Sequence, residues 1–158
     1  MPLLLDAPER TRRVQRAAAR FCAALGWAPL SEVPLPNGRR ADILALLPDG
    51  TFRIIEVKSC ARDFLSDRKW HEYREFCDAL LFAVDADFPQ ALLPEDVGLI
   101  CAASVDDSAL LRPARMHPLA PARRRAMLLR YAMLAGTRAS AMADPEVGLL
   151  ARMALRLE

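Results

Sequence analysis

The stretch from Arg39 to Lys58 constrains the fold most, because it consists of two apolar segments joined by Pro48–Gly50, which reads Pro-Asp-Gly. Such a combination favours a tight reversal of the chain, so the stretch predicts a β-hairpin. Three charged residues interrupt its apolar pattern, namely Asp42, Glu56 and Lys58. A charge within an apolar strand costs free energy unless a partner compensates it. The hairpin therefore predicts a charged site within the sheet.

Strand geometry brings these charges together. Side chains two residues apart share a face of a strand, so Glu56 and Lys58 point the same way. A turn centred on Asp49 places Asp42 opposite Glu56, and cross-strand side chains lie about 5 Å apart at Cβ. Two carboxylates and a backbone carbonyl such as that of Val57 suit Mg²⁺ or Mn²⁺. A salt bridge across the sheet, without a metal, is the alternative that the spacing leaves open.

The chemistry of such a site follows from its residue types. A metal-activated water can attack phosphorus, and Lys58 would orient that water or stabilise the charge on the phosphate. The chain has two lysines, Lys58 and Lys69, and both fall in or just after this charged group. An ammonium group is a point charge, unlike the planar fork of arginine. This detail weakly favours a chemical role for Lys58.

The 158 residues are enough for one domain with a substantial core. The net charge of +2 is unevenly spread, because arginines crowd residues 10–20, 39–40 and 112–138 while most carboxylates lie between residues 42 and 107. That pattern suits a bound polyanion, although solvated arginine-rich helices explain it equally well. No apolar run approaches the length of a membrane span. The four scattered cysteines lack zinc-ligand spacing, and a cytoplasmic protein with reduced thiols is expected.

Hydrophobic periodicity predicts an α/β protein with a mixed sheet. A helix over Pro8–Leu25, ended by Gly26, precedes three antiparallel strands over residues 28–35, 40–47 and 51–59. Ser66 is expected to cap a second helix. Buried strands are then predicted at 80–84 and 97–102, with a further short strand at 109–113.

The remaining chain is predicted to be helical. Pro121 suits a first helical turn, and Gly136 is expected to end that helix. Asp144 and Pro145 are then expected to open a final helix. The expected division is a domain over residues 1–136 and a C-terminal helical extension over residues 137–158.

Asp42, followed by a short turn and Glu56-Val57-Lys58, resembles the signature of the PD-(D/E)XK nuclease superfamily, in which Ala41 replaces the usual proline. Further runs resemble the MmcB-type bacterial DNA repair proteins over roughly Val14 to Tyr131. These runs are Glu32-Val33-Pro34-Leu35, Gly38-Arg39-Arg40-Ala41-Asp42, Glu56-Val57-Lys58-Ser59, Asp63-Phe64, Ser66-Asp67-Arg68-Lys69-Trp70, Phe82-Ala83-Val84, Ala86-Asp87-Phe88-Pro89, Leu93-Pro94-Glu95-Asp96 and Gly98-Leu99-Ile100.

The resemblance implies a restriction-endonuclease-like αβββαβ core with a mixed central sheet and extra C-terminal helices. It also implies a DNA repair factor of nuclease ancestry, tied to the DNA-damage response and damage-induced mutagenesis. The implied catalytic residues are Asp42, Glu56 and Lys58, with Asp42, Glu56 and Val57 as metal ligands. Glu32 is a further candidate ligand, with Glu9 as a rival, and for each a surface carboxylate is the alternative.

Five residues near the signature are candidate DNA contacts, namely Arg39, Arg40, Lys69, Trp70 and Tyr73. The arginines could hold phosphates, and Trp70 could stack on an unpaired base. Packing between a helix and the sheet is the alternative role for Trp70.

The leading hypothesis is metal-dependent phosphodiester hydrolysis of DNA during repair, by a protein associated with the nucleoid. The alternative is a catalytically silent DNA-binding or adaptor module working with error-prone repair polymerases.

Overall fold

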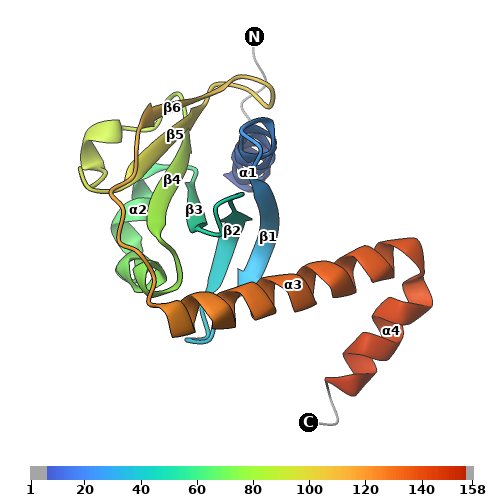
Figure 1. Cartoon of the computed structure of the whole chain (residues 1–158). Helices are drawn as coiled ribbons and strands as arrows, with labels where there is room; N and C mark the ends of the chain where they lie inside the picture. Colours follow the sequence, from blue (N-terminus) through green and yellow to red (C-terminus); the bar gives the residue numbers. More distant parts are fainter. Residues whose placement is uncertain (1–6, 156–158) are drawn as a thin grey trace. The chain divides into compact units, whose positions relative to one another are not determined.

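The computed structural model describes residues 7–155, which form two compact units divided after Leu119 (Figure 1). The first unit contains α1 (Ala7–Ala24), β1 (Ala28–Pro34), β2 (Arg40–Leu46), β3 (Phe52–Lys58), α2 (Ala61–Ser66), η1 (Trp70–Phe76), β4 (Ala79–Asp85), η2 (Gln90–Leu92), β5 (Gly98–Ala102) and β6 (Ser108–Arg112). The second unit contains α3 (Pro121–Ala143) and α4 (Pro145–Ala154). None of the helices in this described part is long and apolar enough to cross a membrane.

The six strands form one mixed sheet in the order β1-β2-β3-β4-β5-β6. The first three strands are antiparallel neighbours, as the two tight turns predict. β4 lies parallel to both β3 and β5, and β6 closes the sheet as an antiparallel strand. The predicted α/β fold with a mixed sheet and C-terminal helices is thus confirmed, and it is consistent with a nuclease-like core.

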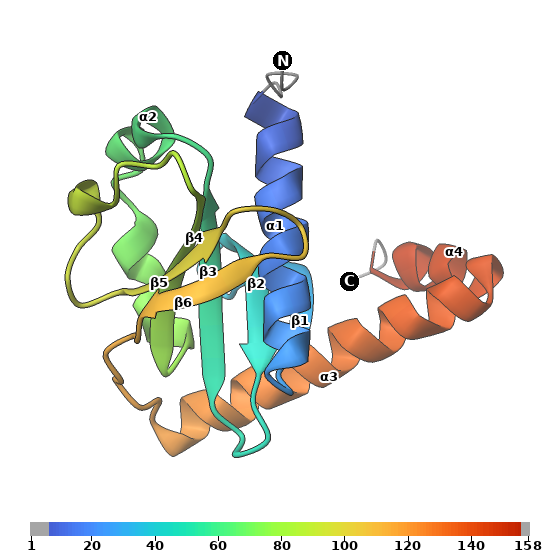
Figure 2. The same ribbon diagram turned by 90° about the horizontal axis from the view of Figure 1, so that it is seen from above.

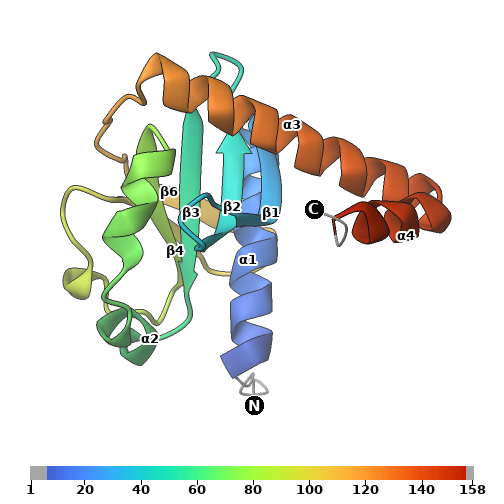
Figure 3. The same ribbon diagram turned by 90° about the horizontal axis from the view of Figure 1, so that it is seen from below.

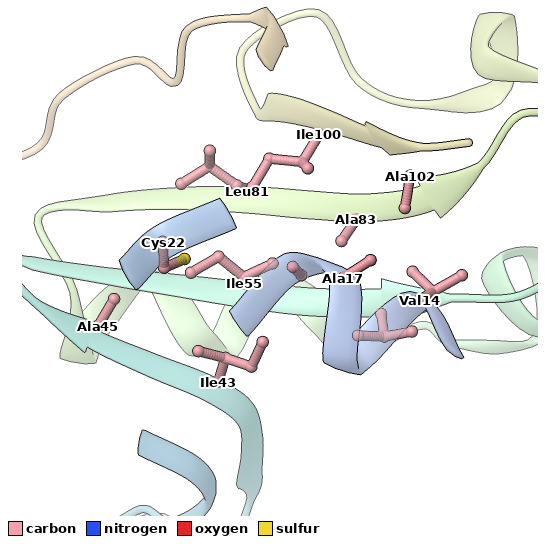
Figure 4. Packing of buried hydrophobic residues seen from close by; sticks show 12 residues of the cluster. Val14, Ala17, Cys22, Ile43, Ala45, Ile55, Leu81, Ala83, Ile100 and Ala102 are labelled. Carbon is pink, nitrogen blue, oxygen red and sulfur yellow. The ribbon is translucent and has the colours of Figure 1, made fainter. Parts of the chain in front are cut away.

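Helix α1 packs on one face of the sheet. Its buried side chains are Val14, Ala17, Ala18 and Cys22, and they meet Ile43, Ala45, Ile55, Val57, Leu81, Ala83, Ile100 and Ala102 (Figure 4). Most of the buried residues on the helix are small, so its backbone can approach the sheet closely. The odd-numbered residues of β2 and β3 therefore face α1.

The other face carries the even-numbered residues and is covered by α2 and η1 (Figure 3). Phe82 of β4 meets the rings of Phe64 and Trp70 edge-on, with centroids 5.5 and 5.6 Å away. Edge-to-face contacts of this kind are favourable. The charged residues of the hairpin lie on this second face.

Gly26 ends α1, as predicted. Its φ of 78° is left-handed, and the N–H groups of Gly26 and Trp27 donate to the carbonyls of Ala23 and Cys22. These two bonds satisfy carbonyls that the end of a helix leaves without partners.

The prediction that Ser66 begins a helix is wrong. Ser66 is the last residue of the short helix α2, and its hydroxyl donates back to the carbonyl of Asp63. Serine can bond to the backbone at either end of a helix, so the residue type alone does not give the direction. The following segment, η1, is a 3₁₀ helix.

In the second unit, α3 continues through Gly136, where the sequence predicts its end. Gly136 has no positive φ, so it acts as an ordinary helical residue at a cost of about 1 kcal/mol relative to alanine. The helix ends before Asp144, whose side chain accepts the N–H of Glu146 and caps α4 as predicted. The expected domain boundary after residue 136 thus falls within α3.

Asp78 joins the start of β3 to the segment that follows β6. This fully buried carboxylate accepts the N–H of Phe52 at 2.7 Å and the N–H of Leu119 at 2.8 Å. Its backbone carbonyl also accepts the N–H of His117. One side chain therefore satisfies donors from two distant segments.

We predict that Asp78→Ala lowers the free energy of unfolding by about 2–4 kcal/mol, because it leaves the buried N–H of Phe52 and the part-buried N–H of Leu119 without this acceptor. Chemical denaturation monitored by circular dichroism measures this loss. Asp78→Asn, which keeps one acceptor oxygen, should lose less, and the exposed Asp87→Ala should change little. Equal stability of Asp78→Ala and Asp87→Ala would contradict the prediction.

Candidate functional site

The charged site lies where the hairpin strands stop pairing through their backbones. The ladder between β2 and β3 ends at Ile43 opposite Ile55. One residue further, the N–H of Asp42 donates to Glu56 Oε1 at 3.1 Å, and the N–H of Val57 donates to Asp42 Oδ2 at 2.8 Å. Each carboxylate thus takes a backbone donor from the opposite strand, and the predicted register of Asp42 against Glu56 is confirmed.

Both acidic side chains and Lys58 belong to the sheet face covered by α2 and η1. Glu56 is 4% exposed and Lys58 is 8% exposed, while Asp42 is half-buried. The ammonium of Lys58 contacts Asp67 Oδ2 at 2.6 Å. Asp67 therefore has a defined partner at this site.

Burial changes the acidity of both carboxyl groups. It raises the pKa of Asp42. Burial and the neighbouring Asp42 charge raise the pKa of Glu56 to about 8. The pKa of Asp67 is lowered, because hydrogen bonds from Lys58 and the Lys69 N–H outweigh its own burial. The site therefore holds two carboxyl groups for which ionisation is costly.

Gln15 of α1 also belongs to this site, although the sequence analysis does not identify it. Its Nε2 donates to the carbonyl of Asp42 at 3.2 Å. Both backbone groups of Asp42 are therefore bonded by side chains, its N–H by Glu56 and its carbonyl by Gln15. The position of Gln15 directly after the buried Val14 is a faint signal for this contact, and the distance along the chain hides it.

Glu32, the further candidate ligand, lies on β1 at the position opposite Asp42. The β1–β2 ladder pairs Ser31 with Ile43 and Val33 with Ala41, so Glu32 lies between two paired positions. Glu32 has a left-handed φ of 51°, which costs on the order of 1 kcal/mol for such a residue. Its exposed side chain lies 3.9 Å from the guanidinium of Arg40. Glu9, the rival candidate, lies exposed in the first turn of α1.

The candidate DNA contacts have different surroundings. Arg39 is bonded to Glu72 at 2.8 Å, and Arg40 is exposed. Tyr73 is nearly buried, and its hydroxyl donates to the carbonyl of Arg40 at 3.1 Å. Burial, followed by the charges of Glu56 and Asp42, raises the pKa of Tyr73. Tyr73 therefore secures the strand that carries Asp42.

Lys69 is exposed, while Trp70 lies between η1 and the sheet. The Trp70 ring contacts Phe64 and Phe82, and the guanidinium of Arg74 lies 5.3 Å from its centroid. These contacts correspond to the packing role that the sequence leaves open as an alternative. A stacking role for Trp70 on DNA stays a prediction.

The donor set suits a hard divalent cation. Asp42 and Glu56 lie close together, their pKa values are raised by burial and they are costly to ionise without a counter-charge, so a cation would favour their ionised forms. No group of three or more His, Cys, Asp or Glu side chains suited to a metal occurs within residues 7–155. Mg²⁺ needs few protein ligands because it usually retains several waters. Val57 stays a predicted carbonyl ligand.

The raised pKa of Glu56 predicts a pH-dependent stability. Glu56 titrates near 8 in the folded chain instead of at its ordinary 4.5, so the folded chain holds more protons between these values. The metal-free protein should therefore lose stability as pH rises through this window, by at most about 1.4 kcal/mol per pH unit for one proton. Urea denaturation at a series of pH values measures the slope.

Glu56→Gln should reduce this slope, because glutamine does not titrate yet can still accept the Asp42 N–H. Glu95→Gln, at an exposed position, should leave it unchanged. A wild-type stability that is flat or rises across the window would contradict the prediction.

Comparisons with known proteins place this chain in a family. A solved structure of a protein of unknown function from Silicibacter pomeroyi is 39% identical and has a TM-score of 0.81, over 91% of this chain and 96% of that one. No curated protein matches. The family model described as DNA repair protein MmcB-like matches residues 5–146. Because this match spans most of the sequence, the chain belongs to the MmcB-like family.

Proposed function

We propose that this protein acts in DNA repair and hydrolyses phosphodiester bonds of DNA with the help of Mg²⁺ or Mn²⁺. The family description supports a repair role and an interaction with DNA. The observation that carries the catalytic proposal is the facing pair of carboxyl groups, the half-buried Asp42 and the buried Glu56. Their nearest lysine, Lys58, contacts Asp67 instead. A divalent cation would supply the positive charge that this pair needs.

Each residue of the site has a separate proposed role. Asp42 and Glu56, with the carbonyl of Val57, would hold the cation, and Glu32 is a further candidate. The cation would act as a Lewis acid on the phosphate and make a water more acidic. Lys58 would orient the attacking water or stabilise the phosphate charge, and Asp67 keeps its ammonium near the carboxylates.

The DNA backbone would be held at the rim of the site. Arg40 and Lys69 are exposed there, and Arg39 is fixed by Glu72. Guanidinium groups bind phosphates in a fixed geometry, and these contacts position the strand without reading its sequence. Trp70 and Tyr73 are the remaining candidates, and both support the surrounding backbone or packing.

A second candidate function is a catalytically silent module that binds DNA or works with error-prone repair polymerases. The 2.6 Å contact between Lys58 and Asp67 favours it, because that lysine already has a partner. Both acidic side chains also accept backbone N–H groups, so they stabilise the hairpin without a metal.

Cleavage assays separate these functions. We predict that the wild-type protein cuts DNA when Mg²⁺ or Mn²⁺ is present, and that Asp42→Asn and Lys58→Ala each lower the rate by about 100-fold or more. The substrates should include single-stranded, duplex, flapped and junction DNA. Glu95→Gln is the matched control for loss of a surface carboxylate. Binding without cutting on every substrate would favour the silent module.

Thermal unfolding tests the cation independently of cleavage. A ligand that binds the folded chain raises stability by RT ln(1 + [L]/Kd), which is about 2.7 kcal/mol at 100-fold Kd. Mg²⁺ or Mn²⁺ should therefore raise the melting temperature of the wild-type protein at pH 8 but not that of Asp42→Asn. The same small shift in both proteins would show that the cation binds elsewhere.

A further inference from the structure

A second charged cluster lies on the opposite face of the sheet. Asp85, the last residue of β4, is 2% exposed. Arg10 Nε lies 3.4 Å from its Oδ2, and an Arg13 terminal nitrogen lies 3.8 Å from the same oxygen. The two arginines are three residues apart on α1, so they share one face of that helix. About a third of each arginine side chain stays exposed.

The register places this cluster at the same edge of the sheet as the candidate site. β3 and β4 are parallel, and Lys58 pairs with Val84, the residue before Asp85. Successive side chains point to opposite faces, so Asp85 faces α1 whereas Lys58 faces α2. Figures 2 and 3 both show the first turns of α1 at the same end of the sheet as α2.

The cluster is incomplete as a structural ion pair. Neither carboxylate oxygen of Asp85 accepts a hydrogen bond from the described residues, and the buried Nε of Arg13 has no acceptor among them. A buried carboxylate normally has its full set of hydrogen bonds. Two guanidinium groups face one carboxylate, so the cluster has a net positive charge. The cluster therefore carries one more positive charge than negative charge.

We propose that Arg10 and Arg13, positioned by Asp85, bind a backbone phosphate of the DNA strand next to the candidate site. The inference rests on the proposed action on DNA. A phosphate supplies the negative charge that balances the second guanidinium group, and arginine forks match its geometry. The exposed third of each side chain makes the pair accessible to the strand. Asp85 acts through the arginines and is a positioning residue.

The salt dependence of DNA binding tests the phosphate contact. Neutralising one phosphate contributes about −0.9 to the slope of log K against log salt for duplex DNA, and about −0.7 for single strands. The double variant Arg10→Ala/Arg13→Ala should bind more weakly, with a slope shallower by about 1. Arg16→Ala, an exposed position on the same helix, is the matched control. Fluorescence anisotropy in EDTA measures binding without cleavage.

Asp85→Asn distinguishes a role of Asp85 in positioning the two arginines from an effect of net charge on DNA binding. If Asp85 orients the arginines, its loss weakens DNA binding severalfold, although the variant is less negative. If net charge alone matters, the same change strengthens binding, and that result would overturn the positioning role. Thermal unfolding should show that the variant is folded at the temperature of the assay.

Arg10→Lys/Arg13→Lys provides a second variant that keeps both charges. A lysine pair cannot form the planar fork, so binding should again weaken. Wild-type affinity in this variant, together with a slope for the alanine double variant equal to that of Arg16→Ala, would overturn the inference and leave the cluster a purely structural one.

The outcomes also separate this inference from the proposed cleavage. If the wild-type protein binds DNA without cutting it and the alanine double variant has the shallower slope, the phosphate site stands and the cleavage proposal fails. If the protein cuts DNA and that slope equals the slope of Arg16→Ala, the phosphate site fails and cleavage stands. If the wild-type protein binds no form of DNA, both are wrong.

Discussion

The candidate site depends on the exchange of hydrogen bonds between Asp42 and the strand opposite. At this point the β2–β3 ladder no longer continues through backbone groups. The carboxylate of Glu56 accepts the N–H of Asp42, and the carboxylate of Asp42 accepts the N–H of Val57. These two bonds hold the carboxylates opposite each other, with Glu56 buried and Asp42 half-buried. Ionising two neighbouring carboxyl groups away from water costs free energy. The presence of such a pair within an apolar hairpin is the main physical reason to expect a compensating cation.

The surrounding elements support this arrangement from both faces of the sheet. Gln15 reaches the Asp42 carbonyl from α1, while Tyr73 of η1 bonds the carbonyl of Arg40. Lys58 is held near the carboxylates by Asp67. The backbone around Asp42 is thus fixed by side chains of α1, η1 and β3, the last through Glu56, which limits the movement of the Asp42 carboxylate. Such support is what a precisely placed ligand requires.

Much of the hairpin and of the candidate site could be predicted from the sequence, because the contacts that define them are local. The turn around Asp49 sets the register of Asp42 against Glu56, and strand alternation puts Glu56 and Lys58 on one face. Gly26 and Asp144 were correctly placed, since their roles depend on the adjoining turn alone. These predictions follow from backbone geometry over a few residues.

The remaining features depend on long-range packing. Gln15 and Asp42 are 27 residues apart, and the approach of Arg10 to Asp85 requires the complete sheet. Ser66 was placed at the wrong end of a helix because serine bonds to the backbone at both ends. Gly136 did not end α3, because no left-handed conformation occurs there and its neighbours include good helix formers.

Anomalous scattering from crystals grown with Mn²⁺ tests the central claim most directly. We expect an anomalous difference peak within ligand distance of both the Asp42 and Glu56 carboxylates, and we expect that peak to be absent from crystals of Asp42→Asn. Well-ordered carboxylates with no peak between them, at a Mn²⁺ concentration that fills other sites, would contradict it. The acidic pair would then only stabilise the hairpin.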